Sequence, residues 1–198
     1  LNLQGCYAIS MEYFPSHTLS GEIPDGKPLD VRKCLKYSRD MATGMAGAHQ
    51  AGVSHRDLKP ANILVNEEGL LKIVDFGVAA AASSGDTQLT KTGYVIGSPK
   101  YMAPEQILGK KVDETADVYS VGVIMYEMAT GIPPYSRGDH MSVMYQHVQG
   151  KATPAQEVNP EIPDEYADII EKAMSVDKTK RFQSMDDLTD ALDSVKLN

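Results

Sequence analysis

The sequence predicts a mainly α-helical domain with one short β-hairpin near its start. The chain has 198 residues, of which 42% are hydrophobic and 23% charged, and this is enough for a single buried core. Helical apolar spacing dominates after residue 30, whereas strand-like segments are few and early. One stretch is apolar on nearly every side, which is typical of a helix in the middle of a domain.

The first fifty residues are predicted to hold an edge strand, a loop and a long helix. Residues 7–13 alternate or run apolar up to Pro15, which favours a strand at the domain edge. Residues 20–28 are rich in Gly, Pro and Asp and indicate a loop. Asp30 can then cap a helix in which apolar residues return every three, four or six positions and which stops before Gly52.

A β-hairpin and several later helices are predicted to follow. Short strands at 63–66 and 71–74 flank a turn-forming segment at 67–69. Residues 83–92 have no apolar period and indicate a long loop. The apolar stretch at 116–129 predicts the central helix. Further amphipathic helices are expected near residues 141–148, near residues 166–174, and after Ser184, which forms a near-match to a capping box with Asp187.

Charge and cysteine content argue against several classes of function. The net charge of −8 argues against nucleic acid or an anionic membrane as the main partner, because both need a basic face. Cys6 and Cys34 form no CxxC pair, which is typical of buried, reduced thiols. There is no uncharged apolar run of 18 residues and no signal-like start. We therefore expect a cytoplasmic segment, and a membrane anchor outside this segment is left open.

Two polar motifs lie at the two ends of the predicted hairpin. The segment HRDLKPAN (residues 55–62) directly precedes the first strand, and DFG (residues 75–77) directly follows the second. Because a hairpin brings its ends together, Asn62 and Asp75 can converge on a cation. Carboxylate and amide oxygens suit Mg²⁺, which also binds phosphates and retains waters. The alternative is that Asp57, Asn62 and Asp75 are ordinary turn residues.

In their order and spacing these motifs resemble those of the protein kinases, and the resemblance covers essentially the whole chain. It implies ATP as the phosphate donor and Mg²⁺ as the metal, with Mn²⁺ as an alternative. Asp57 would accept or orient the proton of the substrate hydroxyl, while Asn62 and Asp75 would hold the metal ions. Lys59 would reach the transferred phosphate and offset its developing charge. A lysine at this position indicates Ser and Thr of proteins as substrates.

Further matches follow in the order of the family. Ser98 matches a small hydroxyl residue beside the catalytic Asp and Lys, and Glu105 lies in the Ala-Pro-Glu motif that closes the activation segment. Asp117 begins the central helix, where the family ties that helix to the catalytic loop. Arg181 falls where a late arginine pairs with Glu105. The run VIGSPKYMAPEQ (residues 95–106) makes the bacterial Ser/Thr kinases the closest match.

The resemblance also assigns residues to nucleotide binding. Met11, Glu12 and Phe14 match the hinge along the adenine edge, and Leu64 matches the residue beneath the adenine ring. The alternative is a plain edge strand and a core leucine. The nucleotide-binding set is completed by three residues that would face the phosphates or the metal: Lys59, Asn62 and Asp75.

Regulation is expected in the long loop. Thr90 and Thr92 align with activation-loop threonines that bacterial relatives phosphorylate, and Arg56 would be the partner of such a phosphate. Simple loop polarity is the alternative.

The histidines are expected to be structural. The family packs His55 against Phe76 in an apolar stack. The other four histidines stand alone and are expected in surface or capping positions: His17, His49, His140 and His147.

Three parts of a complete kinase have no counterpart in this sequence: the glycine-rich loop, the strand lysine and the helix glutamate that pairs with it. We therefore expect a protein-kinase-like C-terminal lobe without the N-terminal lobe. Residues 1–15 would be the last small-lobe strand and the hinge, and residues 16–198 the larger lobe. Such a chain would be the inactive part of an active Ser/Thr protein kinase.

Two alternatives to this interpretation are a pseudokinase-like binding or substrate-docking module and a small-molecule phosphotransferase of related fold. Intact motif residues argue against the first, and the Ala-Pro-Glu and Ser98 segments argue against the second. Besides protein substrates and the small lobe, a second copy of the chain is an expected partner. It would form a homodimer through the face that otherwise meets the small lobe.

Overall fold

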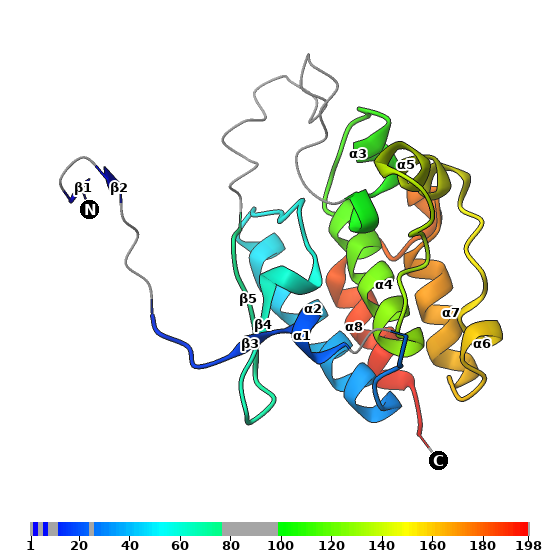
Figure 1. The fold of residues 1–198 in the computed structure, drawn as a ribbon, viewed down its shortest axis with the longest axis horizontal. Coiled ribbons are helices and arrows are strands. Elements are labelled where there is room, and N and C mark those ends of the chain that lie inside the picture. Colours follow the sequence, from blue (N-terminus) through cyan, green and yellow to red (C-terminus); the bar gives the residue numbers. More distant parts are fainter. Residues whose placement is uncertain (1, 4–5, 8–11, 24–25, 77–98, 198) are drawn as a thin grey trace.

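The structure is a computed structural model that describes residues 2–3, 6–7, 12–23, 26–76 and 99–197 (Figure 1). Two long helices form its centre, α2 (Val31–Gln50) and α4 (Thr115–Thr130), which pack against each other. α2 also packs against α8 (Met185–Ser194), and α4 against α7 (Asp164–Ala173). The prediction of a mainly helical domain is therefore confirmed.

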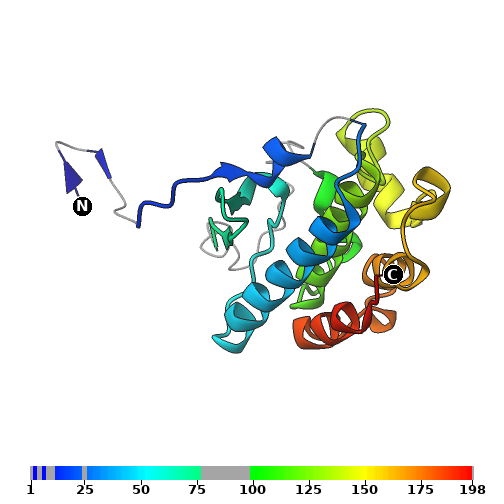
Figure 2. The same ribbon diagram turned by 90° about the horizontal axis from the view of Figure 1, so that it is seen from below.

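Shorter elements surround these four helices. They are α1 (Leu19–Glu22), η1 (Pro60–Asn62), η3 (Pro99–Tyr101), α3 (Pro104–Ile107), α5 (His140–Gln149), α6 (Ala155–Val158) and η4 (Lys178–Lys180). α5 packs against both η3 and α3, and α6 lies against α4 and α7. Figures 1 and 2 show the sheet beside α2 and, on the other side of α4, helices α6 and α7.

The predicted hairpin is part of a three-stranded antiparallel sheet. β4 (Ile63–Val65) pairs with β5 (Leu71–Ile73) as expected, and β3 (His17–Thr18) pairs with the other edge of β4. Of the expected strand at 7–13, Tyr7 lies in β2 (Cys6–Tyr7), which pairs with β1 (Asn2–Leu3). Residues 8–11 lie outside the described residues, and residues 12–16 have no regular secondary structure. The predicted loop at 20–28 was wrong at its start, where α1 extends to Glu22.

Capping and apolar periodicity explain the ends of α2. The side chain of Asp30 accepts hydrogen bonds from the backbone amides of Arg32 (2.9 Å) and Lys33 (3.3 Å), as predicted for an N-cap. The inner face of α2 buries Leu35 and Met41 among others, so the helix lies with one stripe in the core.

α4 is the centre of the core, as predicted. All of its residues except Glu127 are buried. Gly122 lets α7 approach closely, since a Cβ at this position would lie 2.8 Å from the Cβ of Ala173. The helix ends at Gly131, whose φ of 77° is left-handed. The capping box at the start of α8 is also present, between Ser184 and Asp187.

Two further expectations concern thiols and membranes. Cys34 is buried, and burial raises the pKa of its thiol to about 12, so it is an inert core residue. In the part of the chain that the structure describes, no helix is both long enough and apolar enough to cross a membrane.

Candidate active site

The two ends of the β4–β5 hairpin are joined at the backbone. η1 leads directly into β4, and Asp75 lies two residues after β5. The amide of Val74 donates a hydrogen bond to the carbonyl of Asn62 (2.9 Å), next to the ladder pair Ile63 and Ile73. The predicted convergence of the hairpin ends is therefore present in the backbone, and the binding of a metal there stays a prediction.

The loop before η1 presents a carboxylate to solvent. The side chain of Asp57 is 47% exposed, and its Oδ2 lies 2.7 Å from Nζ of Lys59. The amide nitrogen Nδ2 of Asn62 donates to the backbone carbonyl of Asp57 (3.0 Å). This bond fixes the side-chain amide, and its Oδ1 is the atom that remains suited to a cation. The three predicted catalytic residues of this loop therefore lie together.

His55 connects the loop to the end of β5. Its Nε2 lies 2.9 Å from the carbonyl of Val74, so Nε2 carries the hydrogen, and Nδ1 accepts from the backbone amide of Asp57 (3.3 Å). The ring centroids of His55 and Phe76 are 4.9 Å apart. The predicted packing of His55 on Phe76 is confirmed, and both ring nitrogens serve to hold the backbone.

Two residues of the site have a left-handed backbone that is costly for non-glycine residues. Arg56 has φ 64° and Asp75 has φ 62°. The turn at Arg56 is held from two sides. The buried carboxylate of Asp117 accepts hydrogen bonds from the backbone amides of His55 (2.9 Å) and Arg56 (2.8 Å), and Gln106 donates to the carbonyl of Arg56 (2.8 Å). The predicted tie between Asp117 and the catalytic loop is confirmed.

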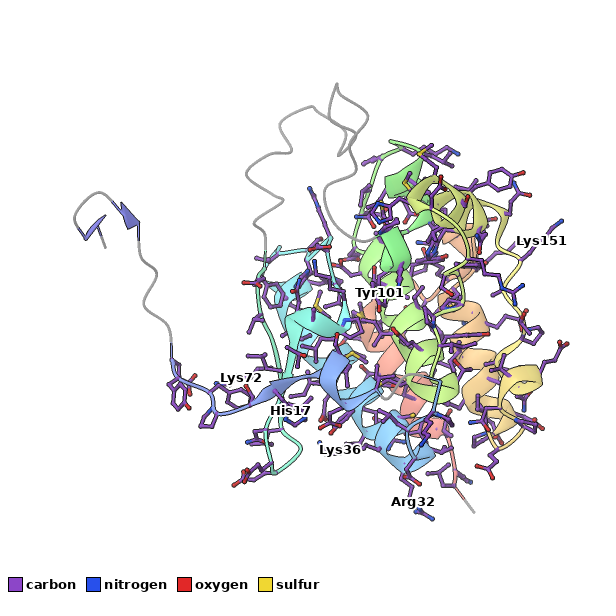
Figure 3. All side chains as sticks on the ribbon, viewed as in Figure 1. His17, Arg32, Lys36, Lys72, Tyr101 and Lys151 are labelled. Atoms are coloured by element: carbon purple, nitrogen blue, oxygen red, sulfur yellow. The ribbon has the colours of Figure 1, made fainter. Side chains whose placement is uncertain are left out.

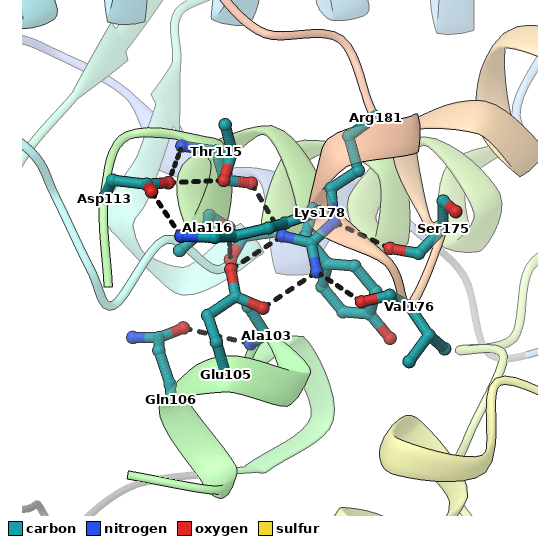
Figure 4. A network of polar contacts seen from close by, with 12 residues as sticks. Ala103, Glu105, Gln106, Asp113, Thr115, Ala116, Ser175, Val176, Lys178 and Arg181 are labelled. Atoms are coloured by element: carbon teal, nitrogen blue, oxygen red, sulfur yellow. Dashed lines mark hydrogen bonds and ion pairs between the residues drawn. The ribbon is translucent and has the colours of Figure 1, made fainter. Parts of the chain in front are cut away.

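A buried ion pair holds α3 against the segment between η4 and α8 (Figure 4). Nη1 and Nη2 of Arg181 lie 2.7 Å and 2.8 Å from the two carboxylate oxygens of Glu105, as predicted. Arg181 also stacks over the ring of Tyr119, with its Cζ 4.8 Å from the ring centroid. Its remaining N–H groups donate to the backbone carbonyls of Thr115, Ser175 and Val176. All five N–H donors of the guanidinium are therefore used.

Two of the residues predicted to contact adenine, Glu12 and Phe14, lie beside β5. Figure 3 labels Lys72 on β5. Glu12 forms an ion pair with Lys72 (2.6 Å), and Nζ of Lys72 also lies 4.6 Å from the ring centroid of Phe14. Leu64 is half-buried in β4. These contacts bring Glu12 and Phe14 to the sheet edge, and nucleotide binding by these residues stays a prediction.

Four predicted functional residues lie outside the described residues: Met11, Thr90, Thr92 and Ser98. The whole predicted loop at 83–92 lies there as well.

The oxygen ligands at the hairpin ends fit Mg²⁺ better than a metal ion that is coordinated by protein side chains alone. Among the residues that the structure describes, no group of three or more His, Cys, Asp or Glu side chains is placed to hold a metal ion. One carboxylate, from Asp75, and one amide oxygen, from Asn62, would leave most positions for phosphate oxygens and water. This is the usual coordination of Mg²⁺ at nucleotide sites.

Two of the buried histidines were assigned wrongly from the sequence. The side chain of His49 is only 6% exposed and its Nε2 contacts the carboxylate of Asp117 (2.8 Å). His147 is fully buried, with its Nδ1 2.8 Å from the hydroxyl of Tyr119. Each histidine follows a buried Met or Val by four positions on its helix, so helical spacing would have placed both on the inner face.

A hollow of about 410 Å³ lies behind the catalytic loop. It is lined by His49, Gly52, Ser54, Asp113, Glu114, Thr115 and Gln183. It includes none of the residues predicted to carry catalysis.

Comparison with known proteins agrees with this geometry. A family model described as the protein kinase domain matches residues 3–192. A probable serine/threonine-protein kinase of Clostridium acetobutylicum is 36% identical over 190 residues, which are 96% of this chain and 29% of the relative. The serine/threonine-protein kinase PrkC of Bacillus subtilis is 35% identical over 196 residues, covering 97% of this chain and 30% of the relative. The serine/threonine-protein kinase PknB of Mycobacterium tuberculosis is 34% identical over 176 residues, covering 89% of this chain and 28% of the relative.

The chain thus spans less than a third of the length of each of these curated relatives. The matched range of the family model is far more than half of the chain. The chain belongs to the protein kinase family.

Proposed function

We propose that this chain is the catalytic part of a Ser/Thr protein kinase, which transfers the γ-phosphate of ATP to Ser and Thr of proteins. The observation that carries the proposal is the arrangement of the catalytic loop. An exposed Asp57 carboxylate, paired with Lys59 and tied to Asn62, lies at a hairpin end that also presents Asp75. The names of the relatives, serine/threonine-protein kinases, support the same substrate class.

The proposed roles follow from what each side chain can do. Oδ2 of Asp57 would accept the hydrogen bond of the substrate hydroxyl and orient its oxygen toward the phosphate. Lys59, 2.7 Å from that carboxylate, is close enough to contact the phosphate that moves toward the hydroxyl. Asn62 and Asp75 would hold Mg²⁺, which when bound neutralises phosphate charge. His55 has no role in proton transfer because both its ring nitrogens hold backbone groups.

We also propose that the described helical body is the larger lobe of the kinase, with the hinge at residues 11–14. Its support is that the catalytic motifs lie on a mainly helical body with a three-stranded sheet at one side. The family's glycine-rich loop and strand lysine would then come from a small lobe that covers this sheet and completes the ATP site. On this proposal the isolated 198-residue chain lacks turnover, and it would work in the cytoplasm.

The test compares Asp57→Asn and Asp75→Asn in the full-length protein with Mg²⁺ and ATP. Asp57→Asn should reduce kcat by a factor of about 100 or more and leave ATP affinity nearly unchanged, because its hydrogen bond matters in the transition state. Asp75→Asn should also weaken Mg²⁺-dependent ATP binding. If Asp57→Asn weakened ATP binding as much as Asp75→Asn, the assigned roles would be wrong. ATP binding without any transfer by the unmodified protein would favour a binding module instead.

Regulation through the long loop belongs to the same proposal. Phosphate on Thr90 or Thr92 would interact with Arg56, next to Asp57, and order the segment up to Glu105. Mass spectrometry of the active full-length protein should find phosphate on at least one of the two. Full activity of the Thr90→Ala, Thr92→Ala double variant would remove this part of the proposal.

Pairing of two copies through the sheet face is a further expectation. The apolar residues expected at that face are Met11, which lies outside the described residues, and Phe14, Leu64 and Val74, which are half-buried. Light scattering of the chain at several concentrations tests it, and a monomer at millimolar concentration would contradict it.

A further inference from the structure

His49 lies between two carboxylates behind the catalytic loop. Its Nε2 is 2.8 Å from Oδ2 of Asp117, and its Nδ1 is 3.9 Å from Oε2 of Glu114. Asp117 lies in the first turn of α4, and Glu114 is the N-cap residue of that helix. The side chain of His49 is 6% exposed, whereas that of Glu114 is 48% exposed.

The hydrogen-bond pattern decides which ring nitrogen carries a hydrogen. The carboxylate of Asp117 accepts from two backbone amides, those of His55 and Arg56, and an ionised carboxylate can only accept. Nε2 of His49 must therefore donate to it. If the ring were neutral, Nδ1 would then carry no hydrogen and would present only its lone pair.

A bare lone pair at Nδ1 does not match its surroundings. Nδ1 is buried and has no hydrogen-bond partner among the described residues. Its nearest charged neighbour is the carboxylate of Glu114, which is also an acceptor. Two acceptors would face each other across 3.9 Å, and a proton on Nδ1 turns this repulsion into attraction.

The charge balance around Asp117 leads to the same conclusion. A buried carboxylate needs a counter-charge or a full set of donors. Among the described residues, the donors to Asp117 are two backbone amides and the ring of His49, of which only the ring can carry a positive charge. Asp113, the other acidic residue in the wall of the hollow, is already paired with Lys178.

We propose that His49 is doubly protonated and forms a cationic bridge between Asp117 and Glu114. Through Asp117 the bridge fixes the backbone amides of His55 and Arg56, and so the left-handed turn that places Asp57. His49 is thus a positioning residue, remote from the reacting atoms. Its effect on catalysis depends on the kinase function proposed above, but its protonation state does not.

The protonation state can be measured directly by ¹⁵N NMR of the histidine side chains in this chain, with His49→Gln identifying the signal. In the imidazolium form both ring nitrogens of His49 carry hydrogen and have similar ¹⁵N shifts at pH 7. A neutral ring, with hydrogen on Nε2 alone, would give two widely separated shifts and would overturn the proposal.

The second arm tests the role of Glu114. Glu114→Gln keeps an acceptor and removes the charge, so the two ¹⁵N shifts of His49 at pH 7 should move apart, toward those of a neutral ring. Glu165→Gln is the matched control, because Glu165 also lies at a helix start, on α7, and should leave the shifts of His49 unchanged. Unchanged shifts of His49 in Glu114→Gln would show that no bridge exists.

The third arm connects the bridge to catalysis in the full-length protein. At pH 7 the kcat of Glu114→Gln should be lower than that of the unmodified kinase, while KM for ATP stays constant. If the ¹⁵N shifts of His49 move in Glu114→Gln and kcat does not change, the bridge exists but does not position the loop. Absence of all turnover with an intact NMR bridge would instead count against the proposed function.

Discussion

Removal of the carboxylate of Glu105 would leave the guanidinium of Arg181 buried and charged without its counter-ion. The side chain of Arg181 is 0% exposed and that of Glu105 is 6% exposed, so water cannot replace the lost partner without local opening. Two charge-assisted hydrogen bonds, of 2.7 Å and 2.8 Å, would be lost. We therefore choose Glu105→Met, which keeps the approximate length of the side chain and removes only its charge and acceptors.

The expected cost is about 3–5 kcal/mol of unfolding free energy, the usual range for breaking one partner of a buried pair. Arg181→Met should cost at least as much, because it also leaves three backbone carbonyls without their donor. The double variant, Glu105→Met with Arg181→Met, removes both charges. It should be close to Arg181→Met alone, so that the coupling between the two changes is about 3 kcal/mol or more.

The assay is urea unfolding of the 198-residue chain followed by circular dichroism, with thermal unfolding as a second measurement. For a chain of this size, a loss of 3–5 kcal/mol corresponds to a fall in Tm of roughly 10 °C. Lys178→Met is the matched control. Lys178 also joins the C-terminal segment to the start of α4, through Asp113, but this pair is 37% and 40% exposed and should contribute less than about 1 kcal/mol (Figure 4). Additive single changes, or a Glu105→Met variant as stable as Lys178→Met, would refute the reasoning.

Two other predictions concern helix packing and acid stability. Gly122→Ala should destabilise the chain by about 1–3 kcal/mol, because a Cβ at this position overlaps α7. Gly47→Ala, on an open helix face, should stabilise the chain by about 0.5–1 kcal/mol. Urea unfolding measures both changes, and a change of the same sign in the two variants would contradict this prediction. Burial lowers the pKa of His147 from 6.5 to about 4. Below pH 6.5 His147 is protonated in the unfolded chain, whereas in the folded chain it stays neutral down to about pH 4. The free energy of unfolding should therefore fall by up to about 3 kcal/mol as the pH is lowered through this window. His147→Gln should flatten that slope, and equal slopes in the two proteins would contradict the assignment.

The helices were predictable because their signals are local. Asp30 is followed by regular apolar spacing, so both the cap and the buried face of α2 could be derived from twenty residues. α4 was recognisable from its uniform apolarity, and the capping box at Ser184 from a spacing of three residues. Each of these features depends on neighbours within one or two helical turns.

The strands were less predictable because their partners are distant in sequence. β3 has only two residues, His17 and Thr18, and pairs with β4 across more than forty positions. No period can be recognised in two residues, and the segment predicted to be a loop begins two positions after Thr18. The pairing is decided by the tertiary fold and is therefore absent from any local pattern.

The catalytic motifs identified the reacting residues, but the conformation of the loop depends on distant support. Arg56 and Asp75 adopt left-handed backbones that their residue types disfavour, so no local propensity predicts them. The cost of the turn at Arg56 is offset by the carboxylate of Asp117, sixty-one positions away, and by Gln106, fifty positions away. Both supports are held by the core: Asp117 by its place in the buried helix α4, and α3 by the ion pair of Glu105. A change in that ion pair should therefore act on the catalytic loop as well as on stability, and the kcat of variants that stay folded would measure this connection.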